Sequence, residues 1–217
     1  RDELIDWLRR RVLGDDNIDT MTCVANLGSL LLQIGQGGEA ESYFREALER
    51  RRRILGEEHP HTLKSIGAWG EFLREQGKLG EAEAYHREAL TKRRRVLGED
   101  HSDTLSSINE LAVLLRSQGK LDEAVQYFRE VTEKRRRLQG EMHPSTLNAI
   151  QNLGTVLDSS GHSAEAEALM REALAKKRQL LGMDHMSTLT TLGNLAVYLI
   201  GQNKFAEAEP LCRETLE

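Results

Sequence analysis

The chain has 217 residues, of which 39% are hydrophobic and only 5% are aromatic, and it contains three prolines. Its net charge is −5, from 35 acidic and 30 basic residues. That balance argues against a dedicated nucleic-acid binder, a class that is usually basic overall or on one face. No apolar stretch approaches the roughly 20 residues that a membrane-spanning helix needs. We therefore expect neither nucleic acid nor a membrane as a partner.

A fixed interval of 42 residues organises the sequence. Three residue types recur at this spacing: Gly14, Gly56, Gly98, Gly140 and Gly182; Thr20, Thr62, Thr104, Thr146 and Thr188; and Ala40, Ala82, Ala124, Ala166 and Ala208. Such a period indicates one structural unit that is copied and stacked, rather than a compact domain with one cleft. The chain is therefore predicted to be a repeat protein.

In chain order, we expect a partial repeat at 1–14, full repeats at 15–56, 57–98, 99–140 and 141–182, and a partial repeat at 183–217, all in one continuous solenoid. Residues 1–14 match only the second helix of a repeat. The last segment stops inside a second helix without the polar capping face that terminal repeats carry. We therefore expect a slice of a longer array.

Each repeat is predicted to be a hairpin of two helices. In the repeat at 57–98, apolar residues follow helical spacing from Leu63 to Leu73, Gly77 interrupts the pattern, and a second helical pattern runs to Leu97. Pro60 suits the first turn of the first helix, where its missing N–H costs nothing. We expect a first helix of about 16 residues, a slightly longer second helix and no β-strand.

Small residues recur in the middle of the first helix, at Gly28, Gly70, Ala112, Gly154 and Ala196. We expect them to face the recurring alanine of the second helix, which lets the two helices approach closely. Bulkier residues are expected around this contact, among them Phe44, His86, Phe128, Met170 and Cys212.

Basic runs end the second helices, at 50–53, 92–95, 134–137 and 176–178. They are candidates for a ridge that binds phosphate or acidic partners. The favoured interpretation is a solvated structural ridge, because each run lies near a helix C-terminus and begins four residues after a glutamate.

No catalytic or metal site is predicted. The histidines His59, His101, His143 and His185 recur once per repeat, so they do not converge on one point as metal ligands must; we expect them to cap or pack at the start of the first helix. The glycines are isolated, which excludes a phosphate-binding loop, and no nucleophile has a local signature. We expect no cofactor and no enzymatic activity.

The small and bulky positions resemble the tetratricopeptide repeat, whose pattern is W-x2-L-G-x2-Y followed by A-x3-F. One repeat here reads Val24-x2-Leu27-Gly28-x2-Leu31 and then Ala40-x3-Phe44. The 42-residue length and the junction at 55–63, Leu-Gly-Glu-Glu-His-Pro-His-Thr-Leu, resemble kinesin light chains and the similar arrays of nephrocystin-3-like and NB-ARC-linked proteins. The resemblance implies an all-α, right-handed α-solenoid of tetratricopeptide-type helical hairpins.

By the same resemblance, the first helices line a concave groove that holds a peptide or protein segment. Asparagine can donate and accept at once, so it can clamp a peptide backbone. The candidate groove residues are Asn26, Lys64, Arg74, Asn109, Arg116, Asn148, Asn152 and Asn194. Ala68 and Glu110 interrupt the asparagine series, and we expect a ligand of mixed charge with an apolar anchor near Val113 or Val197.

The sequence therefore predicts a non-enzymatic interaction scaffold or adaptor. Two other functions remain open: a regulatory arm attached to an effector or nucleotide-switch domain, and an RNA-binding solenoid. The second would need aromatic groove residues for stacking on bases, and the groove positions contain none. Cys23 and Cys212 lie at opposite ends of the array, so no disulfide is expected, which suits a reducing, cytoplasmic location.

Overall fold

The computed structural model describes residue 12, residue 14 and residues 16–214, and its regular structure in residues 16–214 is entirely helical. The helix expected at 1–14 lies almost wholly outside the described residues. The first helix of each pair, here called an A helix, spans 16 residues. The A helices are α2 (Ile18–Gln33), α4 (Pro60–Glu75), α6 (Ser102–Ser117), α8 (Pro144–Ser159) and α10 (Met186–Gly201).

The second helix of each pair, here called a B helix, spans 19 residues wherever it is described in full. The B helices are α3 (Gly37–Leu55), α5 (Leu79–Leu97), α7 (Leu121–Gln139), α9 (Ser163–Leu181) and α11 (Phe205–Glu214). Successive A helices begin 42 residues apart, as do successive B helices. The expected helical hairpins, with the longer helix second, are confirmed. The division into repeats by residue number stays a prediction.

Histidines begin four of the A helices. The ring Nδ1 of His59 accepts a hydrogen bond from the backbone N–H of His61 at 3.2 Å, and His143 accepts from Ser145 at the same distance. His101 and His185 make the equivalent bonds at 3.1 Å. These bonds satisfy a backbone N–H that the first turn of a helix leaves unpaired. The predicted capping role of the histidines is therefore confirmed.

Glycine ends four of the B helices. Gly56, Gly98, Gly140 and Gly182 follow α3, α5, α7 and α9 with φ between 87° and 91°. Side chains disfavour this left-handed region, so the turn into the next A helix selects glycine. This requirement explains the glycine period that dominates the sequence.

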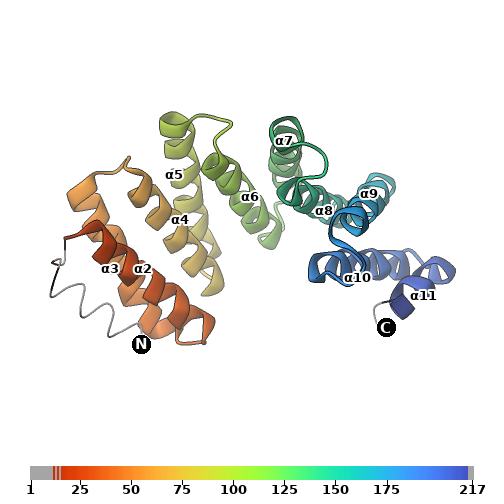
Figure 1. Ribbon diagram of the computed structural model, residues 1–217, viewed down its shortest axis with the longest axis horizontal. Coiled ribbons are helices and arrows are strands. Elements are labelled where there is room, and N and C mark those ends of the chain that lie inside the picture. Colours follow the sequence, from red (N-terminus) through yellow and green to blue (C-terminus); the bar gives the residue numbers. More distant parts are fainter. Residues whose placement is uncertain (1–11, 13, 15, 215–217) are drawn as a thin grey trace. The chain divides into compact units, whose positions relative to one another are not determined.

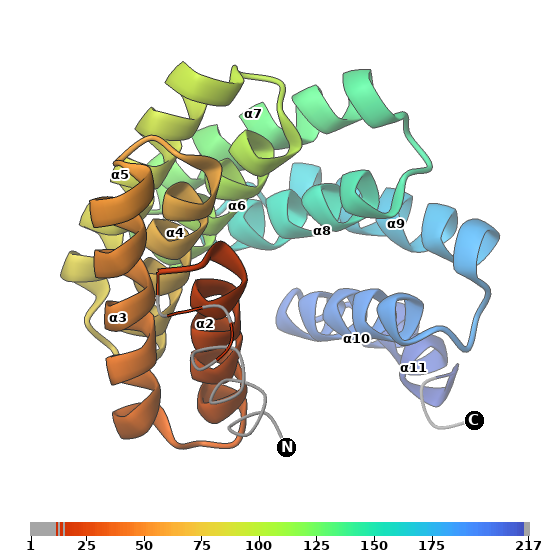
Figure 2. The same cartoon turned by 60° about the vertical axis from the view of Figure 1, so that its left-hand side comes forward.

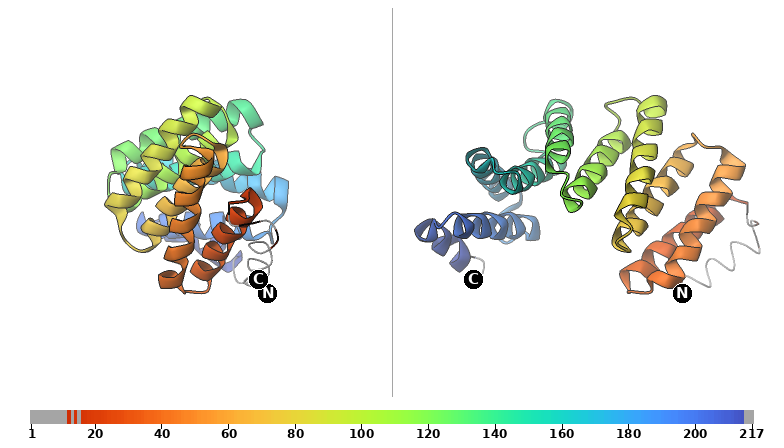
Figure 3. Two further views of the ribbon diagram at one scale, coloured as in Figure 1. Left: turned by 90° about the vertical axis from the view of Figure 1, so that its left-hand side faces the viewer. Right: turned by 180° about the vertical axis from the view of Figure 1, so that it is seen from behind.

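The chain divides into two compact units, of which the first ends at Leu114 and the second begins at Leu115, inside α6. In the first unit α2, α3, α4 and α5 pack in chain order, each against the next (Figures 1 and 2). In the second unit α7, α8, α9, α10 and α11 do the same, and the blue α10–α11 pair is clear from behind (Figure 3). Each unit is thus an all-α solenoid segment of helical hairpins.

The small residue in the middle of an A helix lies close to the B helix, as expected. A Cβ built on Gly154 would lie 3.3 Å from the backbone oxygen of the recurring alanine, Ala166, and 3.0 Å from Met170 Cγ, and one on Gly70 would lie 3.1 Å from the His86 ring. The bulky residue four positions after the alanine shares the contact, because residues four apart lie on one face of a helix.

Two absences complete the description. Neither Cys23 nor Cys212 forms a disulfide. Among the described helices, none combines the length and the apolar character that a membrane span requires.

Candidate functional site

Successive residues of the basic runs in the B helices make different contacts within the fold. The first member of each run pairs with the glutamate one turn earlier in its own helix. The N–O distances are 2.9 Å for Arg50–Glu46, 2.6 Å for Lys92–Glu88, 2.8 Å for Lys134–Glu130 and 2.7 Å for Lys176–Glu172. These pairs confirm the expected spacing of the run after a glutamate.

The third member bridges to the next B helix. Arg52 reaches Glu88 at 2.9 Å, Arg136 reaches Glu172 at 2.7 Å, and Arg178 reaches Glu214 Oε1 at 2.6 Å. Each bridge ties one hairpin to its successor. The ridge thus has a structural role.

The second member of three runs is buried, which corrects the expectation of a solvated ridge. Arg51, Arg93 and Lys177 are 2%, 7% and 1% exposed. Each points towards the next A helix and donates to a hydroxyl there: Arg51 to Ser65 Oγ at 2.7 Å, Arg93 to Ser107 Oγ, and Lys177 to Thr191 Oγ1 at 2.9 Å. A buried charge needs such partners because it has lost its hydration.

The hydrogen bonds between each buried cation and the preceding A helix differ. Arg51 donates to Thr22 Oγ1 of α2 at 2.9 Å, and Lys177 donates to Gln151 Oε1 of α8 at 2.6 Å. Arg93 reaches α4 only through the backbone oxygen of Leu63, at 3.4 Å. Among these three junctions, α4 thus leaves space beside its cation.

That space is a cavity of about 700 Å³ between α4 and α6, within the first unit. Its described lining comprises Lys64, Gly67, Ala68 and Glu71 of α4, Arg93 of α5, and Asp103, Ser106, Asn109, Glu110 and Val113 of α6. Two of the predicted groove residues, Lys64 and Asn109, therefore lie at one cavity.

Two small residues of α4 open the cavity. A Cβ built on Gly67 would lie 3.6 Å from Arg93 Nη2 and 3.8 Å from Glu110 Oε2, which is ordinary contact distance. Gly67 corresponds to Gln151 in α8, and Ala68 corresponds to Asn152. A side chain therefore fits at Gly67, and its absence leaves the Arg93–Glu110 region open.

Glu110 and His86 lie together beneath the opening. The Glu110 Oε2 atom is 3.9 Å from His86 Nδ1 and 4.0 Å from Arg93 Nη1, and the Glu110 side chain is 40% exposed. Burial raises the pKa of Glu110, and the neighbouring carboxylates Glu71 and Asp103 add to that rise while Arg93 opposes it. Within the described residues, no hydrogen bond reaches the Glu110 carboxylate.

His86 is 1% exposed, and neither of its ring nitrogens has a hydrogen-bond partner among the described residues. Burial lowers its pKa, so the neutral ring is favoured. The corresponding residues are Phe44, Phe128, Met170 and Cys212. The imidazole therefore departs from an otherwise apolar series at the cavity floor.

Arg74, a predicted groove residue, is held by its own helix. It pairs with Glu71 at 2.5 Å, and this hydrogen bond is the main cause that lowers the pKa of Glu71 and raises that of Arg74. The expected role of Arg74 in reading an acidic side chain therefore competes with Glu71.

The other predicted residues lie at separate places. Asn26 and Lys64 line a cavity of about 90 Å³ between α2 and α4, and Asn194 lines one of about 470 Å³ against α8 and α9. Asn26, Asn148 and Asn194 are exposed, whereas Arg116 and Asn152 are half-buried. The described residues contain no cluster of metal-ligating side chains.

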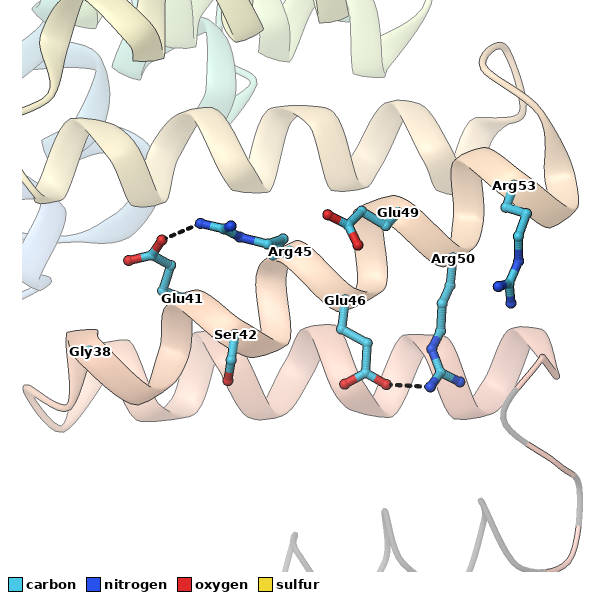
Figure 4. Close-up of a pocket in the computed structure, with 8 residues that line it drawn as sticks. All are labelled: Gly38, Glu41, Ser42, Arg45, Glu46, Glu49, Arg50 and Arg53. Atoms are coloured by element: carbon cyan, nitrogen blue, oxygen red, sulfur yellow. Dashed lines mark hydrogen bonds and ion pairs between the residues drawn. The ribbon is translucent and has the colours of Figure 1, made fainter.

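A further cavity, of about 770 Å³, lies along α3 (Figure 4). All of its described lining belongs to that single helix, and the dashed lines in Figure 4 mark two ion pairs, Glu41–Arg45 at 2.6 Å and Glu46–Arg50 at 2.9 Å. Charges that already neutralise one another along one helix do not converge on a ligand, so the α4–α6 cavity is the better candidate.

Several solved structures share the fold. A putative kinesin light chain with nearly identical TPR-like repeats from Podosopora anserina is 24% identical, with a TM-score of 0.79, covering 90% of this chain and 92% of that one. BtubC (BKLC) from P. vanneervenii is 22% identical, with a TM-score of 0.81, covering 99% and 85%. Rap protein complexed with Competence and Sporulation Factor is 14% identical, with a TM-score of 0.74, covering 90% and 53%.

The sequence itself matches two family profiles described as tetratricopeptide repeat, one at residues 64–137 and 109–179, the other at 20–61 and 188–217. No curated protein matches significantly. Repeats of this type generally serve as non-enzymatic interaction scaffolds. Because the profiles cover most of the sequence and the helical hairpins fold like those of kinesin light chain-like proteins, the chain belongs to the tetratricopeptide repeat family.

Proposed function

We propose that this chain is a non-enzymatic scaffold that binds a peptide or protein segment on its A helices, with the α4–α6 cavity of the first unit as the principal contact. The observation that carries the proposal is the cavity itself. Its volume of about 700 Å³ lies within the range of ligand sites, roughly 300–1,000 Å³.

The position of the cavity supports a binding role. Residues that follow the period are explained by stacking, as the buried cations and the capping histidines illustrate. Ala68, His86 and Glu110 break the series of their equivalents in other repeats, and all three lie at or beneath this one cavity. Stacking does not require these departures, so a ligand is the economical reason for them.

The asparagines remain part of the proposal. Asn109 lines the cavity, Asn26 lies at the smaller α2–α4 cavity, and Asn194 lies on α10 of the second unit. We propose that they hydrogen-bond the backbone of the bound segment. Each contributes about 0.5–1.5 kcal/mol if it makes one neutral hydrogen bond.

Selection from a library of displayed random decapeptides tests the proposal. Binders are measured against the unchanged chain, Gly67→Gln and Gly193→Gln. The two glycines occupy corresponding positions of α4 and α10, and a Cβ on Gly193 would meet nothing within 4 Å. Gly193→Gln therefore controls for the replacement of a helical glycine by glutamine at a position away from the α4–α6 cavity.

We expect recovered peptides to lose at least about tenfold in affinity on Gly67→Gln, because the new side chain occupies the space beside Arg93 and Glu110, and to change less than about twofold on Gly193→Gln. Hydrogen-exchange protection should map to α4 and α6. A selection that yields only peptides insensitive to Gly67→Gln, or protected regions confined to the B helices, would contradict the proposal.

A further inference from the structure

The charges in the α4–α6 cavity are not equally available to a ligand. Arg93 Nη1 donates to the Asp103 backbone oxygen at 3.3 Å and to Ser107 Oγ, and Nη2 donates to the Leu63 backbone oxygen. Most of the guanidinium donors are therefore committed to the protein. The Glu110 carboxylate has its acceptor capacity open, since no hydrogen bond reaches it within the described part of the chain.

The surroundings of Glu110 disfavour an anionic ligand. Glu71 lies across the cavity on α4, and Asp103 lines it on α6. An anion near Glu110 would face the Glu110 and Asp103 carboxylates directly, while the charge of Glu71 is largely offset by its ion pair with Arg74. The two lining cations compete less for a ligand, because Lys64 is exposed to solvent and the guanidinium donors of Arg93 are committed to the protein.

The buried imidazole beneath Glu110 is a second, independent observation. His86 keeps two unpartnered ring nitrogens at a position where the other repeats place apolar residues, and an unsatisfied buried polar group costs stability. Its Nδ1 lies 3.9 Å from Oε2 of Glu110, and Glu110 lines the cavity. A shift of Glu110 by about 1 Å brings the two groups within hydrogen-bond range.

From these observations we propose that the α4–α6 cavity accepts a basic side chain, a lysine or an arginine of the bound segment, whose cationic end pairs with Glu110. The inference rests on the proposed function and names the chemical class of its ligand. The aliphatic part of the basic side chain lies along Ala68 and Val113, and the charged end donates to the carboxylate. His86 acts as a positioning residue, because it holds Glu110 from below and does not touch the ligand.

The geometry suits a long cationic side chain. Lysine and arginine carry an apolar stem and a charged head, so they can place the head at a partly buried carboxylate while the stem covers apolar surface. Hydrogen bonds between charged partners are about twice as strong as neutral ones. The pairing therefore gives selectivity as well as affinity.

The test uses three pools of random decapeptides, acetylated and amidated at their ends, which differ only at a fixed central residue: lysine, norleucine or glutamate. Binding of each pool is measured against the unchanged chain, Glu110→Gln and Glu49→Gln. Glu49 is an exposed residue of the B helix α3, so its variant removes the same charge from a distant face. Gly67→Gln identifies the binding that occurs in the cavity.

We expect the lysine pool to bind at least about tenfold more tightly than the norleucine pool and more tightly still than the glutamate pool. Glu110→Gln should remove this preference while the fold is retained, and Glu49→Gln should leave it unchanged. His86→Met should reduce the preference by less than Glu110→Gln does, because it acts only through Glu110.

Three results separate the inference from the function on which it rests. If peptides bind in a manner sensitive to Gly67→Gln, but the lysine and norleucine pools bind equally, the inference is overturned and the cavity remains a peptide site. If the glutamate pool binds best, Arg93 is the ligand-binding group and the inference is again wrong. If no pool is sensitive to Gly67→Gln, the proposed function itself fails.

Discussion

The α4–α6 junction in the first unit and the α8–α10 junction in the second are built from corresponding residues, each 84 positions apart in the chain. At α8–α10, Gln151 accepts from the buried Lys177 at 2.6 Å and from Thr191 Oγ1 at 2.6 Å. At α4–α6 the corresponding residue is Gly67, and a cavity takes the place of the side chain. The space beside the buried cation is therefore closed in one unit and open in the other, while a cavity of about 470 Å³ lies farther along α8 and α10, at Thr155, Asn194 and Val197.

The comparison extends to the residues around each buried cation. At α8–α10 the cation Lys177 has hydrogen-bond acceptors, and the residues around it, Gln151, Asn194 and Met170, are uncharged. At α4–α6 the residues around Arg93 are Gly67, Glu110 and His86. There the Glu110 carboxylate accepts no hydrogen bond among the described residues, and the imidazole of His86 beneath it has no hydrogen-bond partner. Stability alone favours the first arrangement. The second arrangement is less stable, which the proposed binding site would explain, because functional sites often cost stability.

The largest difference between the two junctions is expected from removal of the buried cation. Arg93→Met leaves Ser107 Oγ and two backbone oxygens without their donor, so we expect a loss of about 2–4 kcal/mol in the free energy of unfolding. Lys177→Met should cost less than about 1 kcal/mol, because Thr191 and Gln151 still hydrogen-bond each other. Urea denaturation, followed by circular dichroism, measures both; equal losses would show that the junctions are energetically alike.

Raising the pH should stabilise the second unit through Lys177. Burial lowers the pKa of Lys177 to about 8, below the value of about 10.4 expected when the chain is unfolded. The unfolded state binds more protons between these values, so stability rises with pH across that window and then levels off. The full effect amounts to roughly 3 kcal/mol at most. The rise should disappear in Lys177→Met, and its persistence there would assign it to another group.

These expectations rely on buried cations, whereas the sequence pattern predicts a solvated ridge for the same residues. The 42-residue period identified the helices, their caps and the glycine turns, because each depends on local chemistry. Burial of Arg51, Arg93 and Lys177 depends on the next hairpin, which a single helix pattern does not reveal. A signal was nevertheless present: Ser65, Ser107 and Thr191 each lie 14 residues after one of these cations.

The cavity, like the burial of the cations, depends on packing between helices that the sequence pattern does not reveal. Ala68 and Glu110 were recognised as departures from an asparagine series, and His86 was expected only as a bulky packing residue. Their proximity requires the packing of α4, α5 and α6, so the sequence could indicate the unusual residues but not the cavity they form. Lys64 and Asn109 were the predicted residues that this packing brought to it.

His86→Met should stabilise the first unit. Methionine corresponds to Met170 at the closed junction and removes two unsatisfied nitrogens, so we expect a gain of about 1 kcal/mol at neutral pH. Trp69 fluorescence during urea denaturation, measured in chains that also carry Trp7→Phe, reports on this unit. A decrease in stability would show that the imidazole has a partner in solution.

The same variant should change the acid side of the stability curve. Because the pKa of His86 is lowered in the fold, the unfolded state binds more protons below about pH 6.5, and His86 makes the protein less stable as the pH falls. The groups around the ring are Glu71 and Arg74 on α4, Arg93 on α5 and Glu110 on α6. Glu110 acts in the opposite direction because its pKa is raised, whereas His61, whose pKa is also lowered by burial, acts in the same direction as His86. His86→Met should therefore lose less stability than the unchanged chain between about pH 6.5 and pH 5, and equal losses would contradict the role given to His86.

The smallest expected effect is on helix stability at the glycines themselves. Gly67→Gln and Gly193→Gln should each add about 0.5–1 kcal/mol, because glycine inside a helix is unfavourable. Gly67→Gln should gain slightly more if its amide oxygen accepts from Arg93, as Gln151 accepts from Lys177. Destabilisation by Gly67→Gln alone would mean that the open junction differs from the closed one in backbone as well as in side chains.

The most direct test compares Val113 at the open junction with Val197 at the corresponding position of α10. Methyl resonances of both valines are followed by NMR while a lysine-containing decapeptide from the selection is titrated into the chain. We predict saturable shifts of the Val113 methyl groups that Gly67→Gln abolishes, with smaller shifts at Val197 that this variant leaves in place. Shifts of Val197 alone, or shifts of Val113 that survive Gly67→Gln, would contradict the claim that the α4–α6 cavity is the binding site.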